Sequence, residues 1–359
     1  GRSPKVKPKV MFKILVYAFM NNIYSSRQIE KYCSRDINFM WLLEECPPPD
    51  HNTISRFRSK KLFNCMEDLF YQLITKLSEL SEIDFNNLFV DGTKIEANAN
   101  KYTYVWKKNV QRNEMNLDNK INDWIVNFNK NFNTHFSNLT QIEKYITKKI
   151  KEENIHFIYE KRKRKTELQK IYETLNEYKD KKRKYQNYNS IFKGRNSFSK
   201  TDEDATFMRL KEDHMRNSQL KPAYNVQIGV SGEYIIGTDI FNNRTDYHTL
   251  IPFLETLKKY LPKFENIVAD AGYESEENYE YLEKNNQISY IKPQTKKKQK
   301  TRKFKNDISK RENMQYLEDS DEYICHNGKK LKFSYLKKKT STSGYTSNVH
   351  VYECENCSN

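Results

Sequence analysis

Two aspartates in this sequence, Asp91 and Asp270, have the surroundings that metal-assisted chemistry on phosphate groups needs. Each follows a short apolar run typical of a buried strand, residues 88–90 and 267–269, and each has a glycine within two positions. Glycine allows a ligand to approach the backbone closely. Carboxylate oxygens are the ligands that Mg²⁺ and Mn²⁺ prefer, and these ions keep positions open for phosphate oxygens and water. An aspartate after a strand usually serves only as a turn or cap residue, so the interpretation depends on the surrounding elements.

The segments around both aspartates alternate between strand and helix patterns. Strand patterns cover residues 87–96, 223–230, 234–240, 267–269 and 288–291, and Ser231-Gly232 forms a two-residue turn between the second and the third. Helical patterns cover residues 247–260 and about 275–284. This order predicts an α/β fold with a mixed sheet and helices packed on it, which we place at residues 83–292.

A long segment inside this core has a different character. Residues 107–188 contain no proline or glycine, and Ile142, Ile146, Leu168 and Leu175 are among the apolar residues that recur at helical spacing. The pattern predicts a long helical hairpin or coiled coil, inserted at about residues 107–195. A coiled-coil scaffold alone would not explain the two aspartates at strand ends.

The first part of the chain, residues 1–82, has helical patterns throughout, so the α/β core is preceded by an all-α module. Three prolines at 47–49 end one helix, and Asp50 stands where the N-cap of the next belongs. In that helix Ile54, Phe57 and Leu62 can face inward while basic residues face outward, as in a helix that enters a DNA groove. A helix-turn-helix and an ordinary three-helix bundle explain the pattern equally well.

The net charge of +16 is concentrated in two segments. Residues 161–184 hold eleven basic and four acidic side chains, and residues 292–311 hold ten basic and one acidic, which together account for the whole excess. Such segments suit a polyanion, because neutralised phosphates release condensed counterions. The alternative is a charged, solvated surface. The candidate DNA-binding residues lie in the 54–62 helix and in the second basic segment: Arg56, Arg58, Lys60, Lys61, Lys296, Lys297, Lys298, Lys300, Arg302, Lys303 and Lys305.

Composition excludes several classes of protein. The longest apolar run, residues 10–20, is too short to cross a bilayer, and no small-residue cleavage site follows it as it would in a signal peptide. The six cysteines are too few and too scattered for a disulfide framework. We therefore expect a cytoplasmic protein with reduced thiols and no membrane partner.

Several motifs, in one order along nearly the whole chain, resemble those of bacterial insertion-sequence transposases of the DDE type. F-V-D-G-T-K-I-E-A-N-A-N-K-Y-T-Y-V-W-K-K at residues 89–108 is similar to their first-aspartate motif, and I-V-A-D-A-G-Y-E-S-E-E-N-Y at 267–279 to their second. Residues 201–215 and 221–230 also resemble that group, as do S-S-R-Q-I-E-K at 25–31 and P-D-H-N-T-I-S-R-F-R at 49–58.

The resemblance implies an RNase H-like core in which Asp91 and Asp270 bind two divalent cations, Mg²⁺ or Mn²⁺, for cleavage and transfer of DNA strands. It also implies transposon-end and target DNA as partners, a homodimer in the active complex, and association with the nucleoid. The family completes its site with a glutamate on a later helix, and the glutamates after residue 291 do not fit that pattern. We therefore expect residues 293–359 to be a basic linker and the start of an incomplete cysteine-containing region, and the chain to be an inactive or partial form.

Other residues offer weaker signals, and one rival function stays open. Cys354 and Cys357 form C-x-x-C, half of a tetrahedral zinc site, and unmetallated thiols are the favoured interpretation. His214 and His248 could act as general bases, but two-metal phosphoryl transfer does not need one, so structural roles are expected. The rival to a transposase is a non-catalytic DNA-binding protein derived from one, which metal-dependent strand cleavage would distinguish.

Overall fold

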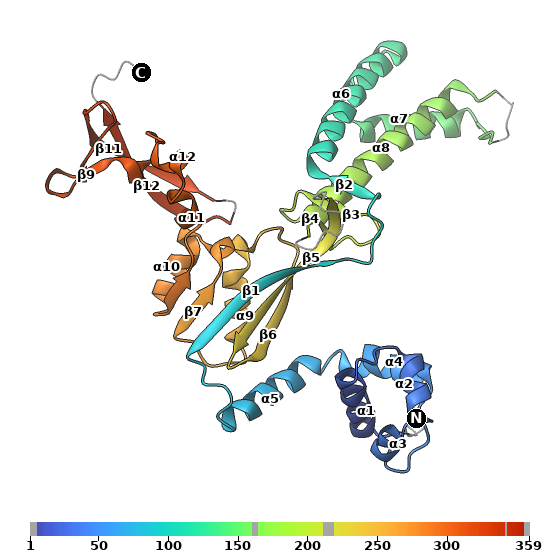
Figure 1. Ribbon diagram of the computed structural model, residues 1–359. Coiled ribbons are helices and arrows are strands. Elements are labelled where there is room, and N and C mark those ends of the chain that lie inside the picture. Colours follow the sequence, from blue (N-terminus) through green and yellow to red (C-terminus); the bar gives the residue numbers. More distant parts are fainter. Residues whose placement is uncertain (1–5, 160–163, 211–218, 342, 355–359) are drawn as a thin grey trace. The chain divides into compact units, whose positions relative to one another are not determined.

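The structure is a computed structural model that describes residues 6–159, 164–210, 219–341 and 343–354 (Figure 1). The chain divides into two compact units, Gly1–Asp84 and Phe85–Asn359. No helix among the described residues is both long and apolar enough to cross a membrane.

The first unit is built from helices. They are α1 (Pro8–Met20), α2 (Ser26–Cys33), α3 (Ile37–Leu42), α4 (His51–Arg56), the π-helix η1 (Phe57–Leu62) and α5 (Met66–Glu79). Asp50 caps α4, since its carboxylate accepts a hydrogen bond from the backbone N–H of Thr53. Ile54 is fully buried, and Phe57 and Leu62 pack against the same core, as the sequence predicts.

The second unit contains a six-stranded mixed sheet. Its strands are β1 (Asn87–Glu96), β4 (Thr206–Arg209), β5 (Leu220–Ser231), β6 (Tyr234–Phe241), β7 (Asn266–Ala269) and β8 (Ile288–Ile291). β1 is antiparallel to β5 on one side and parallel to β7 on the other. β8 continues parallel to β7, while β6 and β4 pair antiparallel with β5. The mixed α/β prediction is confirmed.

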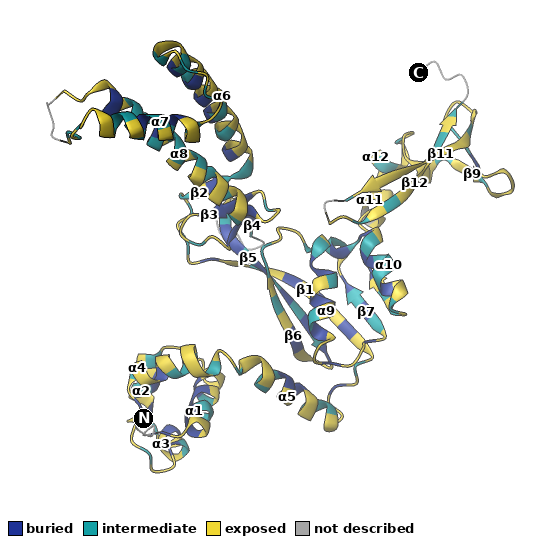
Figure 2. Cartoon of the chain, turned by 180° about the vertical axis from the view of Figure 1, so that it is seen from behind, coloured by how far each residue is buried: buried dark blue, intermediate teal, exposed yellow. Residues whose placement is uncertain are grey.

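Two helices, α9 (Leu250–Leu257) and α10 (Glu276–Lys284), follow β6 and β7 and pack together. The packing on α9 is tight: a Cβ added at Gly229 of β5 would lie 3.1 Å from both Leu88 of β1 and Phe253 of α9. Residues of β1 that point the other way stay exposed, including Phe89 at 52% (Figure 2). Asp91 is on this exposed side of the strand, because it alternates with the buried Val90 and Gly92.

The insertion has three helices, α6 (Lys107–Phe132), α7 (Leu139–Glu152) and α8 (Glu167–Phe192). They share a core that includes Ile142, Ile146 and Leu175. The structure therefore differs from a simple hairpin, because Asn133 ends α6 in the left-handed conformation and Asn138 caps α7. Two short paired strands, β2 (Tyr104–Trp106) and β3 (Ser197–Ser199), join the insertion to the core.

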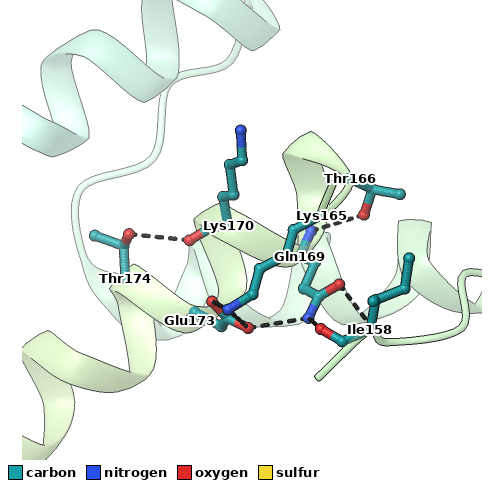
Figure 3. A network of polar contacts seen from close by, with 7 residues as sticks. All are labelled: Ile158, Lys165, Thr166, Gln169, Lys170, Glu173 and Thr174. Carbon is teal, nitrogen blue, oxygen red and sulfur yellow. Dashed lines mark hydrogen bonds and ion pairs between the residues drawn. The ribbon is translucent and has the colours of Figure 1, made fainter. Parts of the chain in front are cut away.

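The buried Gln169 organises the start of α8 (Figure 3). Its side chain accepts a hydrogen bond from the N–H of Ile158 and donates to the carbonyl of the same residue. It also donates to Glu173, which forms an ion pair with Lys165. These bonds attach the loop before α8 to the helix.

The last part of the chain contains more structure than the predicted basic linker. After the short helices α11 (Lys296–Gln299) and α12 (Arg302–Lys305), a four-stranded antiparallel sheet follows, made of β9 (Gln315–Leu317), β10 (Glu322–Ile324), β11 (Lys330–Thr340) and β12 (Thr346–Cys354). Its charged residues face each other across strands: Lys330 binds Glu322, and Lys332 lies opposite Glu353. The prediction of a basic linker missed this sheet, although its strands pair with their neighbours in the sequence, because exposed lysines along β11 hide the alternation of apolar residues that marks a strand.

Candidate active site and DNA-binding residues

Asp91 and Asp270 lie side by side at the centre of the sheet. The last registered pair of the parallel strands β1 and β7 is Val90 with Ala269, so the two aspartates occupy the next position on each chain. Neighbouring strands are about 4.8 Å apart. Both residues are exposed.

Backbone donors hold the two carboxylates. Oδ1 of Asp91 accepts a hydrogen bond of 2.8 Å from the N–H of Gly92, and Oδ1 of Asp270 accepts one of 2.7 Å from Gly272. Each glycine therefore follows its aspartate closely enough to orient it. Because these bonds are local, the orientation exists without any ligand.

A third carboxylate, Asp246, reaches this region and was missed by sequence reasoning. Oδ1 of Asp246 accepts hydrogen bonds from Asn225 at 2.7 Å and from Gln227 at 3.2 Å. A Cβ at position 92 would lie 2.6 Å from the same oxygen, and one at position 272 would lie 3.2 Å from Oδ2. Asp246 therefore occupies the space beside both glycines, and a side chain at position 92 would displace it.

Topology explains how Asp246 reaches this place. β6 runs in the same direction as β1, because both are antiparallel to β5, and β7 is parallel to β1. The carboxyl ends of β6, β1 and β7 therefore lie at the same edge of the sheet, and the segment after β6 begins there. Asp246 lies in the 3₁₀ turn η2 (Asp246–His248) that follows β6. The signal in the sequence was an acid shortly after a strand, which is the signal that identified Asp270.

The negative charge of the site affects the pKa of Tyr273. It is fully buried in the 3₁₀ turn η3 (Ala271–Tyr273), and its hydroxyl donates to Gln227. Burial raises the pKa of Tyr273, and the charges of Asp246, Asp91 and Asp270 raise it further. The phenol therefore stays protonated and keeps its donor role in the network that supports Asp246.

The donor chemistry of the aspartate pair suits a hard divalent cation, since both groups are carboxylates and both are exposed. Within the described residues, however, no group of three or more His, Cys, Asp or Glu side chains is arranged to hold a metal ion. Asp91 and Asp270 alone would therefore be an incomplete set of metal ligands.

The described glutamates after β8 lie in short turns or strands. Glu312 and Glu318 belong to the 3₁₀ turns η4 (Arg311–Asn313) and η5 (Glu318–Ser320). Glu322 in β10 is paired with Lys330, and Glu353 in β12 accepts from Ser334. Glu355 is outside the described residues.

The predicted basic residues of the first unit are in different situations. Arg56, Lys60 and Lys61 are exposed on α4 and η1. Arg58 instead donates to the carbonyl of Tyr24 and lies over the ring of Phe19 at 5.3 Å. Intramolecular contacts therefore occupy Arg58, which makes it a poorer candidate for phosphate than its neighbours.

The basic residues of the second segment lie on α11, α12 and the turn between them. Lys296, Lys298, Lys300, Arg302, Lys303 and Lys305 all have exposed or half-exposed side chains, and Lys297 belongs to α11. In the described part of residues 292–311 we find a single ion pair, Lys310 with Asp307 at 4.0 Å. This segment presents its charge to solvent.

Of the remaining predicted residues, Cys354 ends β12, whereas Cys357 and His214 lie outside the described residues. His248 ends η2, where its ring contacts that of Tyr247.

Two known families match separate parts of the chain. Residues 1–60 match the family described as Transposase domain (DUF772), and residues 195–346, which include Asp246 and Asp270, match the Transposase DDE domain. Neither the curated proteins nor the solved structures contain a match at the threshold applied. The two matches occur in the order in which the motifs occur, and the chain belongs to the DDE-type insertion-sequence transposases.

Proposed function

We propose that the protein binds transposon-end DNA and catalyses metal-dependent cleavage and transfer of DNA strands. The observation that carries the proposal is the register of β1 and β7, which brings Asp91 and Asp270 to neighbouring positions. The strand order β6-β5-β1-β7-β8, with antiparallel pairing on both sides of β5 and parallel pairs beyond β1, supports an RNase H-like core.

The residues of the site have separate tasks in this proposal. Asp91 and Asp270 would hold Mg²⁺ or Mn²⁺, ions that the family generally uses, and a bound cation would activate the attacking oxygen and neutralise charge on the phosphate. Gly92 and Gly272 orient the two carboxylates through their N–H groups. Asp246 is a positioning residue, because it packs beside both glycines while Asn225 and Gln227 hold it in place.

Residues 1–359 alone should cleave DNA slowly. Two carboxylates leave a cation loosely placed. Enzymes accelerate phosphoryl transfer largely by positioning the reacting groups and the metal ions. The described glutamates after β8 lie in strands and 3₁₀ turns rather than on a helix of the expected kind. A second copy in the active complex is part of the same proposal.

The test is strand cleavage of transposon-end DNA with Mg²⁺ or Mn²⁺. The wild-type chain is compared with Asp91→Asn, with Asp270→Asn, and with Asp123→Asn as a control on the exposed surface of α6. A version that carries the C-terminal segment of a full-length relative should cleave much faster than residues 1–359, and either active-site change should abolish that activity. Cleavage that survives both changes would overturn the proposal.

A second candidate is a non-catalytic DNA-binding protein. The absence of a complete metal-binding group among the described residues favours it. DNA binding without cleavage, even by the extended version, would establish this alternative.

A further inference from the structure

A pocket of about 510 Å³ lies beside the segment that carries Asp246. Two loops form most of its wall: residues 193–196, which join α8 to β3, and residues 242–248, which join β6 to α9. Its charged lining residues are Lys193, Arg195 and Arg244, with His248 beside them. None of the described lining residues is acidic.

The polar groups around these cations are donors of the kind that bind phosphate oxygens. Asn196, Asn242 and Asn243 contribute amides, and Thr206 and Thr245 contribute hydroxyls. Lys193 and Arg244 are exposed, and Arg244 makes no ion pair with a described residue. A phosphate would therefore gain charge-assisted hydrogen bonds without displacing an internal carboxylate.

Arg195 gives the pocket a fixed positive charge. Its guanidinium donates to the carbonyls of Ile191, Phe192 and Asp204, at 2.6, 3.2 and 2.8 Å. It thereby caps the last turn of α8 and ties the loop to the strand region. Carbonyl partners leave the guanidinium charge uncompensated by direct contact, although the carboxylates of Asp202 and Asp204 lie near enough to interact with it.

The position of the pocket relates it to the aspartate pair. Asp246 lies between Arg244 and His248 in the chain, and it packs beside Gly92 and Gly272, the neighbours of Asp91 and Asp270. The loop that lines the pocket therefore packs against β1 and against the turn η3, the two elements at which Asp91 and Asp270 lie. The three carboxylates repel the phosphates of an approaching DNA strand, and cations next to them reduce this electrostatic repulsion.

We propose that this pocket binds a phosphate of the DNA strand whose neighbouring phosphate lies at Asp91 and Asp270. The inference rests on the proposed function and adds to it a defined contact for the strand beside the scissile bond. Lys193 and Arg244 supply mobile cations, and Arg195 supplies the fixed one.

The experiment measures binding of a labelled DNA duplex of arbitrary sequence by the full chain over a series of salt concentrations, in EDTA so that no cleavage occurs. The test variant is Lys193→Gln/Arg244→Gln. The control is Lys120→Gln/Arg112→Gln, which removes the same charges from the exposed side of α6. We expect the test variant to reduce the slope of log affinity against log salt by roughly 1 to 2, and the control to leave it unchanged.

The charge-conserving variant Lys193→Arg/Arg244→Lys should keep the wild-type slope. Thermal melting of each variant checks that folding is intact. Equal slopes for the test and control variants would overturn the pocket as a phosphate site and leave the proposed function standing. Failure of the wild-type chain to bind DNA at all would overturn both.

Discussion

Residues 161–184 and 292–311 both carry a large excess of positive charge, but their lysines have different neighbours. Lys165, which precedes α8, forms an ion pair with Glu173. On α8, Lys179 and Lys182 form ion pairs with Glu143 and Asp118, and Lys181 and Arg183 pair within the helix. In the described part of residues 292–311 the single ion pair is that of Lys310. A similar excess of positive charge thus corresponds to different numbers of unpaired basic side chains.

This difference in ion pairing indicates which basic segment should bind DNA. The acids that face α8 come from α6 and α7, so its lysines help to hold three helices together. Lysines on α11 and α12 lie on helices of four residues each, which have no comparable core. We therefore infer that the second segment contributes most of the salt-dependent affinity for DNA, and the first contributes mainly to the stability of the insertion.

The largest expected effect comes from neutralising the second segment. Replacing Lys296, Lys298, Lys300, Lys303 and Lys305 by glutamine should lower the salt slope of DNA binding by up to about 4.5, if each lysine meets one phosphate. The measurement is a titration of a DNA duplex at several salt concentrations. An unchanged slope would show that this segment does not touch phosphate.

The next effect is on stability and concerns Gln169. Gln169→Ala leaves the N–H and carbonyl of the half-buried Ile158 without the side chain that binds them, which should cost about 1–3 kcal/mol locally. Hydrogen exchange of the peptide covering the start of α8 should accelerate, while the salt slope of DNA binding stays at the wild-type value. A changed slope would mean that α8 itself lies on DNA.

The control for Gln169 is Gln141→Ala on α7. Gln141 accepts hydrogen bonds from Ser137, but in an exposed place where water can replace it. Hydrogen exchange at the start of α7 should change much less in Gln141→Ala than exchange at the start of α8 changes in Gln169→Ala. Equal acceleration in both variants would show that burial of Gln169 does not matter.

A smaller effect follows from neutralising the paired lysines of α8. Lys179→Gln, Lys181→Gln and Lys182→Gln in one chain should lower the salt slope by less than about 1, because carboxylates already compensate these charges. Each lost pair should cost at most about 1 kcal/mol of stability. A slope that falls as far as in the second-segment variant would remove the distinction between the two segments.

Sequence patterns predicted well the elements that depend on residues close together in the chain. The strands around Asp91 and Asp270, the hairpin at Ser231, and the cap at Asp50 follow from apolar runs and turn residues within a few positions of each other. The pairing of the two aspartates as a site came from the family resemblance, and the parallel register of β1 and β7 agrees with it.

What the sequence did not predict depends on contacts between distant residues. Asp246 contacts Gln227 and lies beside Gly92 because β1, β5 and β6 pair with one another, and the partners of Lys179 and Lys182 lie on other helices.

The sheet β9–β12 was missed for a different reason. Exposed lysines lie on both sides of β11, so no alternation of apolar residues marks the strand. Charge counts alone cannot separate paired from unpaired lysines.

The smallest expected effect is a dependence of the insertion on acid pH. Hydrogen bonds from Lys165 and Gln169 lower the pKa of Glu173 below its ordinary value of 4.5. A lowered pKa in the folded state means that the ionised carboxylate stabilises the fold above pH 4.5, and that this contribution is lost as the pH falls through the folded pKa. The pair is exposed to water, so the effect is weak. The protection factor of the amides at the start of α8, which removes the intrinsic pH dependence of hydrogen exchange, should therefore fall modestly below pH 4.5 in the wild-type chain. Glu173→Gln should have a lower protection factor at neutral pH and a flatter acid profile. If the substituted chain keeps the wild-type profile, another group supplies the acid sensitivity of the insertion, and the network around Gln169 does not depend on the charge of Glu173.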